Sequence, residues 1–384
     1  MERCLTSRQD RVLAVHVLME REPAGHSARH MAELTSLIQA DGGTVVETLT
    51  LKVRTPNSST LLGSGQISRL GEAAEKCNAD VVVVNRELNP QQQRNIETVI
   101  DQRRIIDRTR LIIDIFARHA SSREGKLEVE DALLRYMLPR LTGKGIVMSQ
   151  TGGGVGTRGP GETKLEMDKR RIKERLGRNK QLIETMKKQR LVQHGRRNRT
   201  GIPLVSLVGY TSAGKSTLLN TFTGAGVRSS ENLFTTLDPI SRKLHLENGN
   251  YAIITDTVGF IDDLPIQLIK AFRTTLEDVA KSDLLLLVVD VSKPDYEDDI
   301  RVVRNVLGEI DADKIATIYV FNKADKIDNS ISLKSLTNMY GRSILVSALQ
   351  GTGIEELKNM ILMELMLKKH GSDIRDNNEL YGTV

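Results

Sequence analysis

The sequence has few aromatic residues, few cysteines and no long apolar run. Aromatic residues make up 3% of the 384 residues and tryptophan is absent, which argues against base stacking as a main mode of nucleic-acid recognition. Two cysteines cannot form a disulfide framework or a zinc site, and they favour a reducing, cytoplasmic setting. The longest apolar run, residues 284–289, is far shorter than the ~20 residues of a membrane span. We expect neither a transmembrane helix nor a signal peptide.

Positive charge is concentrated in one segment of the chain. Residues 1–140 carry a net charge of +1 and residues 201–384 a net charge of −6, whereas residues 141–200 carry 16 Lys+Arg against 5 Asp+Glu. The five acidic residues are too few to neutralise this positive charge through ion pairs along a helix. The segment therefore predicts a surface that binds the phosphates of a nucleic acid. The alternative is a solvated helix face. Lys169, Arg170 and Arg171 form one basic cluster within the segment.

Alternating strand and helix patterns predict an α/β fold in several parts. We expect a small α/β domain over residues 1–105 and a helical and glycine-rich basic connector over 106–200. A doubly wound, mostly parallel domain over 201–365 and a C-terminal tail over 366–384 follow. The expected strands of the second α/β domain are 202–208, 251–255, 284–290, 315–321 and 343–346.

The connector shows helical spacing interrupted by glycine. Its helices are expected over residues 108–120 and 124–138, and a loop is expected over 141–161. Residues 162–194 fit either one long helix or a helical hairpin, and 194–201 read as a linker. The glycine-rich loop 151–161 is either a flexible linker or a loop that contacts RNA or the nucleotide domain, with Arg158 as the side chain to test.

The strongest local signal is the segment GYTSAGKS, which follows a predicted strand and opens a predicted helix. It fits G-x-x-x-x-G-K-[ST], in which backbone N–H groups and the helix N-terminus bind phosphate. We expect Lys215 to neutralise the β- and γ-phosphates and the Ser216 hydroxyl to ligate Mg²⁺. The predicted phosphate-binding residues are Gly209, Tyr210, Thr211, Ser212, Ala213, Gly214, Lys215 and Ser216.

Three segments at later strand ends complete a predicted guanine nucleotide site. Asp256 can hold Mg²⁺ through water, and the N–H of Gly259 can approach the γ-phosphate. The carboxylate of Asp325 can accept two hydrogen bonds from guanine and none from adenine. Lys323 can place its alkyl stem over the base. The predicted residues are Asp256, Thr257, Val258, Gly259, Asn322, Lys323, Ala324 and Asp325, with Ser347, Ala348 and Leu349 meeting the guanine oxygen.

The loop between the first two motifs is expected to sense the γ-phosphate. It contains Phe234, Thr235, Thr236, Leu237 and Asp238. We predict that Thr236 completes the Mg²⁺ shell, with Thr235 as the alternative. The predicted catalytic residues are therefore Lys215, Thr236 and Gly259, and the predicted metal ligands are Ser216 and Thr236.

The order of these motifs resembles the translation-factor branch of P-loop GTPases, and several segments are similar to the HflX family. The similarity extends over about residues 12–365 and is carried by LNPQQQRN, GGGVGTRGPGE, LEMDKRRI, LFTTLDP, DTVGF and VSALQGTGIEEL. It implies a cytoplasmic GTPase that binds the large ribosomal subunit and its RNA, and separates stalled or stress-damaged ribosomes. Ser212 stands where the family usually has Asn, the residue connected with a monovalent cation, so potassium activation is not implied.

Many P-loop GTPases orient the attacking water with a glutamine directly after D-x-x-G, and here that position holds Phe260. Because phenylalanine cannot orient water, we expect slow intrinsic hydrolysis of GTP to GDP and phosphate. We also expect an intrinsic rate that is nearly unchanged in a Phe260→Ala variant. A partner is then required for fast hydrolysis, and the resemblance points to the ribosome.

The function expected from these observations is a GTPase that couples nucleotide binding and hydrolysis to ribosome dissociation or rescue under stress. The alternative is a nucleotide-gated RNA-binding factor for ribosome assembly, or a chaperone, in which hydrolysis is incidental. We expect a monomer that does not bind DNA. Peripheral contact with a membrane is compatible with this interpretation.

Overall fold

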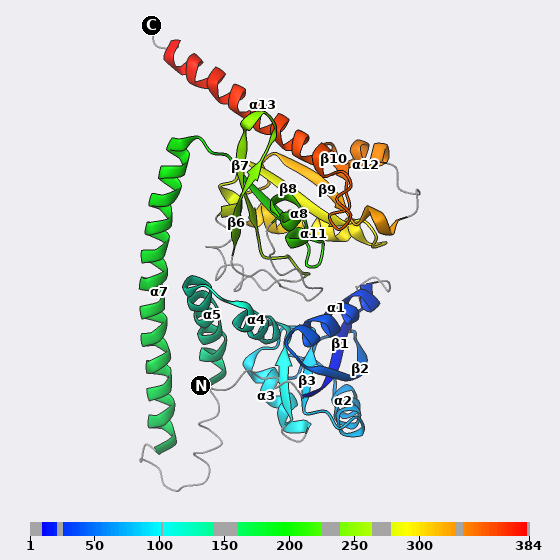
Figure 1. The fold of residues 1–384 in the computed structure, drawn as a ribbon. Helices are drawn as coiled ribbons and strands as arrows, with labels where there is room; N and C mark the ends of the chain where they lie inside the picture. Colours follow the sequence, from blue (N-terminus) through cyan, green and yellow to red (C-terminus); the bar gives the residue numbers. More distant parts are fainter. Residues whose placement is uncertain are drawn as a thin grey trace. The chain divides into compact units, whose positions relative to one another are not determined.

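The computed structural model describes residues 10–20, 26–100, 103–141, 160–224, 239–262, 278–327 and 333–381. The chain divides into two compact units, residues 1–186 and 187–384. Each unit has its own sheet with helices packed on it (Figure 1). Among the described helices, none combines the length and apolarity that crossing a membrane requires.

The first unit is built on a four-stranded parallel sheet in the order β2-β1-β3-β4. All four valines of β3 are buried, as expected for a central parallel strand that is covered on both faces. The helices α2 and α3 cover one face, and α1 and α4 contact the sheet and each other. The elements are β1 (Arg11–Met19), α1 (His26–Ala40), β2 (Thr44–Val53), α2 (Ser64–Lys76), β3 (Val81–Val84), α3 (Pro90–Val99), β4 (Arg104–Asp107), α4 (Arg108–His119) and α5 (Arg123–Leu141).

The strand β4 is not indicated by the sequence pattern, and the predicted domain limit at residue 105 lies inside it. The pattern fails here because only Ile105 and Ile106 are apolar between charged neighbours, which is too short for a periodic signal. The prediction that the helix after residue 124 ends at 138 is also wrong, since α5 continues through Pro139 to Leu141.

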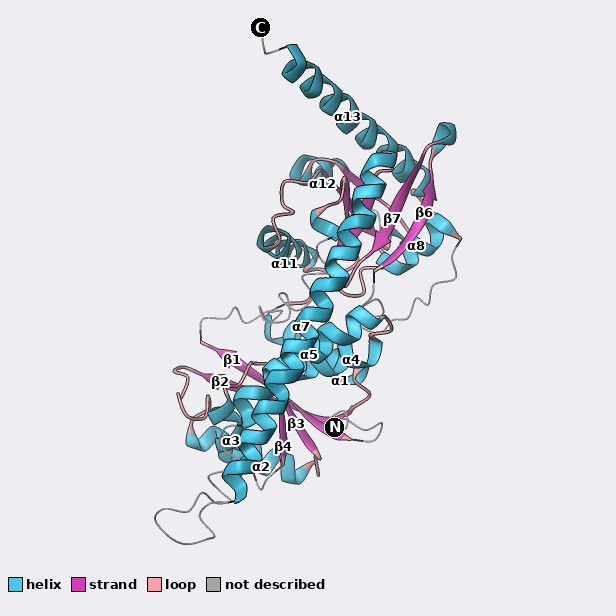
Figure 2. Ribbon diagram, turned by 90° about the vertical axis from the view of Figure 1, so that its left-hand side faces the viewer, coloured by secondary structure: helices cyan, strands magenta, loops and turns pink. Residues whose placement is uncertain are grey.

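The connector ends in one long helix, α7 (Pro160–Thr200). The helical hairpin is therefore wrong, and so is the linker predicted over residues 194–201, which is helical up to Thr200. Lys, Arg, Glu and Gln dominate this segment, and their high helix propensity accounts for its length. Within the first unit, α7 lies beside α5 (Figure 1, Figure 2), where Asn179 donates to a carboxylate oxygen of Glu130 at 3.3 Å and Arg175 forms an ion pair with the same carboxylate.

A buried carboxylate fastens α5 to the carboxyl edge of the first sheet. Asp107 is fully buried, and its Oδ1 accepts hydrogen bonds from the Arg110 N–H at 2.8 Å and the Tyr136 hydroxyl at 3.0 Å. Its Oδ2 accepts from the Leu88 N–H at 3.1 Å and from Arg140 at 3.0 Å. Burial raises the pKa of Asp107, while these donors and the Arg140 charge oppose the rise.

We expect Arg140→Ala to destabilise the first unit by about 3 kcal/mol, because it leaves the buried Asp107 carboxylate without its charged partner. Hydrogen exchange of backbone amides in β3 and β4, measured against denaturant, checks this value. Arg54→Ala is the matched control, since the Arg54 side chain is 88% exposed and lies 3.7 Å from Glu20. The control should change stability by less than about 0.5 kcal/mol. Equal effects of the two substitutions would contradict the role of the cluster.

The second unit has a six-stranded sheet in the order β10-β9-β8-β5-β7-β6. All neighbouring strands are parallel except β6, which pairs with β7 in the antiparallel sense. This confirms the predicted doubly wound, mostly parallel sheet. The edge strand β6 is not predicted, because most of its side chains are exposed and its sequence ISRKLH lacks an apolar run. The strands are β5 (Leu204–Gly209), β6 (Ile240–His245), β7 (Tyr251–Asp256), β8 (Leu284–Asp290), β9 (Thr317–Asn322) and β10 (Ser343–Leu345).

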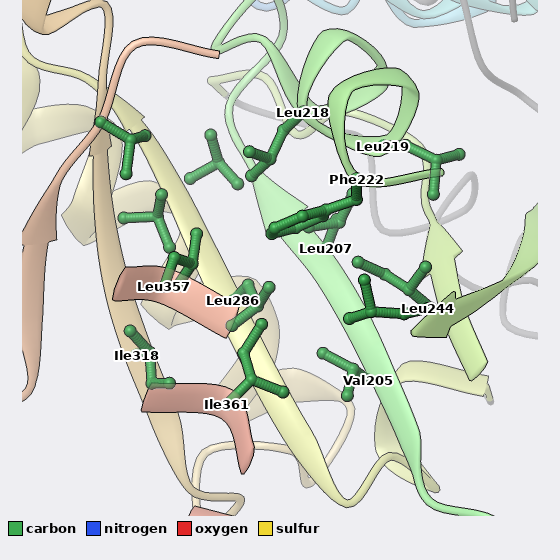
Figure 3. Packing of buried hydrophobic residues seen from close by; sticks show 14 of the residues in the cluster. Val205, Leu207, Leu218, Leu219, Phe222, Leu244, Leu286, Ile318, Leu357 and Ile361 are labelled. Atoms are coloured by element: carbon green, nitrogen blue, oxygen red, sulfur yellow. The ribbon is translucent and has the colours of Figure 1, made fainter. Parts of the chain in front are cut away.

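Apolar side chains fill both faces of this sheet. On one face, Leu218 and Phe222 of α8 pack with Leu207 of β5, and Leu357 of α13 completes the cluster (Figure 3). On the other face, α11 and α12 pack on β8 and β9. Since β7 and β8 lie on opposite sides of β5, the carboxyl end of β5 is the point at which the strand order reverses, where α/β sheets bind ligands. The helices are α8 (Lys215–Thr223), α11 (Tyr296–Glu309), α12 (Leu333–Tyr340) and α13 (Ile354–Tyr381).

Candidate nucleotide-binding site

The predicted motifs meet at the carboxyl edge of the second sheet. The segment GYTSAGKS begins at the last residue of β5 and leads into α8. Asp256 is the last residue of β7 and Asn322 the last of β9, while Ser347 and Ala348 follow β10. The sheet topology therefore brings together segments that are more than a hundred residues apart in the sequence. We refer to residues 209–216 as the P-loop.

The side chain of Asn322 connects three of these segments. Its Nδ2 donates to the Ala213 carbonyl at 2.8 Å, and its Oδ1 accepts from the Ala348 N–H at 3.0 Å. Gly214 has a φ of +95°, and a Cβ there would lie 2.2 Å from Asn322 Nδ2. Glycine is therefore required both by the backbone conformation and by the close approach of this amide.

The P-loop lysine is buried and held by backbone carbonyls. Lys215 is 7% exposed, and its Nζ donates to the carbonyls of Gly209 at 3.0 Å and Tyr210 at 2.9 Å. Burial lowers the pKa of Lys215 to about 8, although the charges of Asp256 and Asp299 act in the opposite direction. The two carbonyl dipoles stabilise the Lys215 ammonium only in part. A bound phosphate would stabilise it further, because it carries a full negative charge.

Two oxygen-bearing side chains meet beside the lysine, as predicted for a Mg²⁺ site. The Ser216 hydroxyl donates to Asp256 Oδ2 at 2.7 Å, and Asp256 is fully buried. Hydroxyl and carboxylate oxygens suit Mg²⁺, so these residues fit the ion. Within the described residues, no group of three or more His, Cys, Asp or Glu side chains forms a separate metal site.

Gly259 lies against the P-loop. A Cβ on this residue would be 2.9 Å from Cγ2 of Thr211 and 3.1 Å from Nζ of Lys215. Its neighbour Thr257 is anchored, since its hydroxyl donates to the Leu207 carbonyl at 2.7 Å. Only glycine allows the backbone to approach the lysine this closely, and the contact of its N–H with the γ-phosphate stays a prediction.

The predicted base-binding segment is held by its neighbours. The Ser347 hydroxyl donates to Oδ1 of Asp325, which aligns the carboxylate that we predict to bind guanine. Lys323 has a φ of +64°, and its Nζ lies 2.6 Å from Oδ2 of Asp290. Leu349, at the end of this group, is 79% exposed.

Asp290 is a site residue that the sequence motifs do not include. It ends β8, it is 4% exposed, and its Oδ1 accepts from the Ser292 hydroxyl at 2.6 Å. It pairs in register with Asn322 on β9, so its carboxylate can anchor the Lys323 ammonium. The sequence does show an acidic residue at the end of a buried strand, which is a signal for a functional position. It does not show that Lys323 is the partner of this residue, because that follows only from the order of β8 and β9 in the sheet.

Several predicted residues lie outside the described part of the chain. They are Phe234, Thr235, Thr236, Leu237 and Asp238, together with Arg158 and most of the glycine-rich loop. The predicted roles of Thr236 in catalysis and in metal binding stay predictions. The structure does describe Ser212, which has a φ of +59° in the P-loop.

Phe260 has a packing role that its motif does not indicate. The side chain is 2% exposed and belongs to the apolar cluster that α11 forms with the sheet, beside Val208 and Leu287. Its backbone N–H donates to the Gly209 carbonyl at 3.1 Å, and its carbonyl accepts from the Thr211 N–H at 2.8 Å. Phe260 therefore supports the core of this unit as well as ending the motif, and the expected intrinsic rate of a Phe260→Ala variant stays a prediction.

Comparison with known proteins assigns the class and the family. Three sequence families match the chain: "GTP-binding GTPase N-terminal" at residues 28–117, "GTP-binding GTPase Middle Region" at 119–197 and "50S ribosome-binding GTPase" at 204–323. A GTPase HflX of Caldanaerobacter subterraneus subsp. tengcongensis is 45% identical over 87% of this chain and 76% of its own length. A GTPase HflX of Alkalihalophilus pseudofirmus is 47% identical over 77% and 70%.

A solved structure agrees with the fold. The crystal structure of the SsGBP–GDP complex covers 93% of this chain and 99% of its own, with a TM-score of 0.51 and 24% sequence identity. The parallel sheet and the P-loop place the second unit in the P-loop class of nucleotide-binding proteins. The chain belongs to the HflX family of GTPases and hydrolyses GTP.

We expect Asp325→Asn to lower the affinity for GTP by at least about 100-fold, because an amide cannot accept both guanine hydrogen bonds. The variant should gain affinity for xanthosine triphosphate, whose additional carbonyl accepts from the amide. Titration with both nucleotides checks the exchange of preference. Unchanged GTP affinity would show that another group reads the base.

We expect Phe260→Ala to destabilise the second unit by about 3–5 kcal/mol, since it opens a cavity in a packed core. Phe260→Leu should retain most of the stability because it fills more of the space. Urea unfolding of both variants, followed by hydrogen exchange in β5 and β8, measures the difference. If both variants unfold like the unsubstituted chain, the packing role is contradicted.

Proposed function

We propose that this GTPase binds the large ribosomal subunit and couples GTP binding and hydrolysis to ribosome dissociation or rescue under stress. The observation that carries the proposal is the combination, in one chain, of a nucleotide site with the long basic helix α7. The description "50S ribosome-binding GTPase", which matches residues 204–323, supports the ribosome as partner.

Three lysines of α7 are suited to bind RNA phosphates. At roughly 100° per residue, Lys169, Lys173 and Lys180 fall within a sector of about 40° on the helix. Lys173 and Lys180 are exposed, and Lys169 is half-buried. Within the described residues none of the three has an ion-pair partner, whereas Arg170 and Arg171 pair with Glu174 and Asp168 at the surface. Such exposed pairs contribute little, and they leave the helix strongly basic.

In the nucleotide site, we infer that Lys215 neutralises the β- and γ-phosphates and that the N–H of Gly259 contacts the γ-phosphate. Ser216 and Thr236 would ligate Mg²⁺, with Asp256 holding it through water. When bound, the ion neutralises charge on the phosphate oxygens. Asp325 would select guanine. The residues at position 260 and beside it offer no side chain that orients water, so we infer slow intrinsic hydrolysis and stimulation by the ribosome.

We further propose that residues 201–365 form the GTPase domain and 366–384 a C-terminal tail, while the first domain continues past the predicted limit at residue 105, because that limit lies inside β4, and the connector follows it up to residue 200. The setting that fits these activities is the cytoplasm. We infer that the protein acts as a monomer on ribosomal RNA and not on DNA.

We expect the triple substitution of Lys169, Lys173 and Lys180 to Glu to weaken binding to large ribosomal subunits and to flatten its salt dependence. Each phosphate that the variant no longer neutralises should lower the slope of log K against log salt by about 0.7–0.9. Pelleting with purified subunits over a salt series measures both quantities. The matched control reverses Lys314 and Lys334, two exposed lysines of the second unit.

Rates of GTP hydrolysis with and without subunits complete this experiment. The triple variant should lose the stimulation by subunits and keep its intrinsic rate and its affinity for GDP. Binding with an unchanged slope would identify the lysines as a solvated face. Full binding without any stimulation in the unsubstituted chain would favour the alternative, an RNA-binding assembly factor or chaperone in which hydrolysis is incidental.

A further inference from the structure

The second residue of the P-loop contacts the segment that follows DTVG. Tyr210 is 5% exposed, and its hydroxyl accepts a hydrogen bond from the backbone N–H of Asp262 at 3.1 Å. Its backbone forms a parallel bridge with Phe260. Three backbone groups at residues 260–262 thus bond to P-loop residues, two through Phe260 and one through Asp262.

The ring of Tyr210 is itself held in place. Nζ of Lys293 lies 5.0 Å from its ring centroid, and the same ammonium forms an ion pair with the buried Asp299 at 3.1 Å. A cation over a tyrosine face is attractive. Since both the ring and the ammonium are fixed by the fold, the hydroxyl presents its oxygen at a defined place.

The segment that Tyr210 holds is the one that approaches the nucleotide. Gly259 lies within contact distance of Thr211 and Lys215, the residue that we propose neutralises the phosphates. Position 260 lacks a glutamine, and the polar group of this segment that we propose to contact the γ-phosphate is the backbone N–H of Gly259, whose neighbours at 260–262 are held by the P-loop. A small displacement of such groups lowers the rate of a reaction that depends on orientation.

We propose that Tyr210 is a positioning residue for GTP hydrolysis, whose hydroxyl holds residues 260–262 against the P-loop. This inference rests on the proposed nucleotide site and is independent of ribosome binding. It assigns to Tyr210 a role beyond the backbone contact that the motif predicts. The hydroxyl acts through Asp262 and does not touch the reacting atoms.

The test is Tyr210→Phe in the full chain, which keeps the ring and removes only the hydroxyl. In a ribosome-free assay, kcat should fall about five- to tenfold, the effect of removing one hydrogen bond, with KM and the Kd for GDP within about twofold of the unsubstituted values. Exchange of the Asp262 amide should become faster, while the Thr211 amide stays protected.

Tyr319→Phe is the matched control, because Tyr319 is a half-buried tyrosine on β9 whose ring contacts Tyr340, away from the P-loop. It should leave kcat and the exchange of the Asp262 amide unchanged. A Tyr210→Phe variant with unchanged or higher kcat overturns the proposal, as does unchanged exchange at Asp262. If the unsubstituted chain does not bind GDP, the nucleotide site itself is wrong, which is a separate result.

Discussion

The nucleotide site depends on one buried side-chain amide. Asn322 bonds to the carbonyl of Ala213 and to the N–H of Ala348, so the end of β9 connects the loop after the neighbouring β10 with the P-loop, which follows β5 two strands away. An amide can do this because it carries a donor and an acceptor in fixed relative positions. The arrangement also explains Gly214, since any larger residue would collide with the amide. The segments that we predict to bind the phosphates and the base are therefore both anchored to the same side chain.

Burial of charge is the second constraint on this edge of the sheet. Lys215 is surrounded by backbone carbonyls, and Lys323 is paired with the buried Asp290. In both cases a buried charge finds a partner, because an isolated buried charge is too costly: the buried group is the Lys215 ammonium in the first case and the Asp290 carboxylate in the second. The two lysines differ in how easily a ligand can replace their partners. The carbonyls around Lys215 are dipoles that a phosphate can outcompete, whereas the carboxylate beside Lys323 holds its ammonium in one place.

The sequence predicts those features of the fold that local patterns encode. The buried central strands of the second sheet, the P-loop and the residues at the strand ends follow from apolar runs and from motif spacing. The edge strand β6 and the short β4 do not, because their stability comes from neighbouring strands and not from their own residues. The pairing of Asp290 with Lys323 and the packing of Phe260 depend on strand order, which no local pattern specifies. The motifs therefore predict which segments meet at the edge of the sheet. They do not predict the contacts that support these segments, such as the Asp290–Lys323 pair and the packing of Phe260.

Phe260 links the core of the second unit to the chemistry of its edge. A polar glutamine at this position would point toward the nucleotide, but a phenylalanine gains free energy by burial, and here it packs under α11. With this side chain buried, residues 260–262 lie beside the P-loop. Their backbone groups form hydrogen bonds there with Gly209, Tyr210 and Thr211. Three backbone groups of the segment, the N–H and carbonyl of Phe260 and the N–H of Asp262, hold it there. Because position 260 offers no side chain to orient water, we propose that the rate of hydrolysis depends on a partner and on how firmly the P-loop holds this segment.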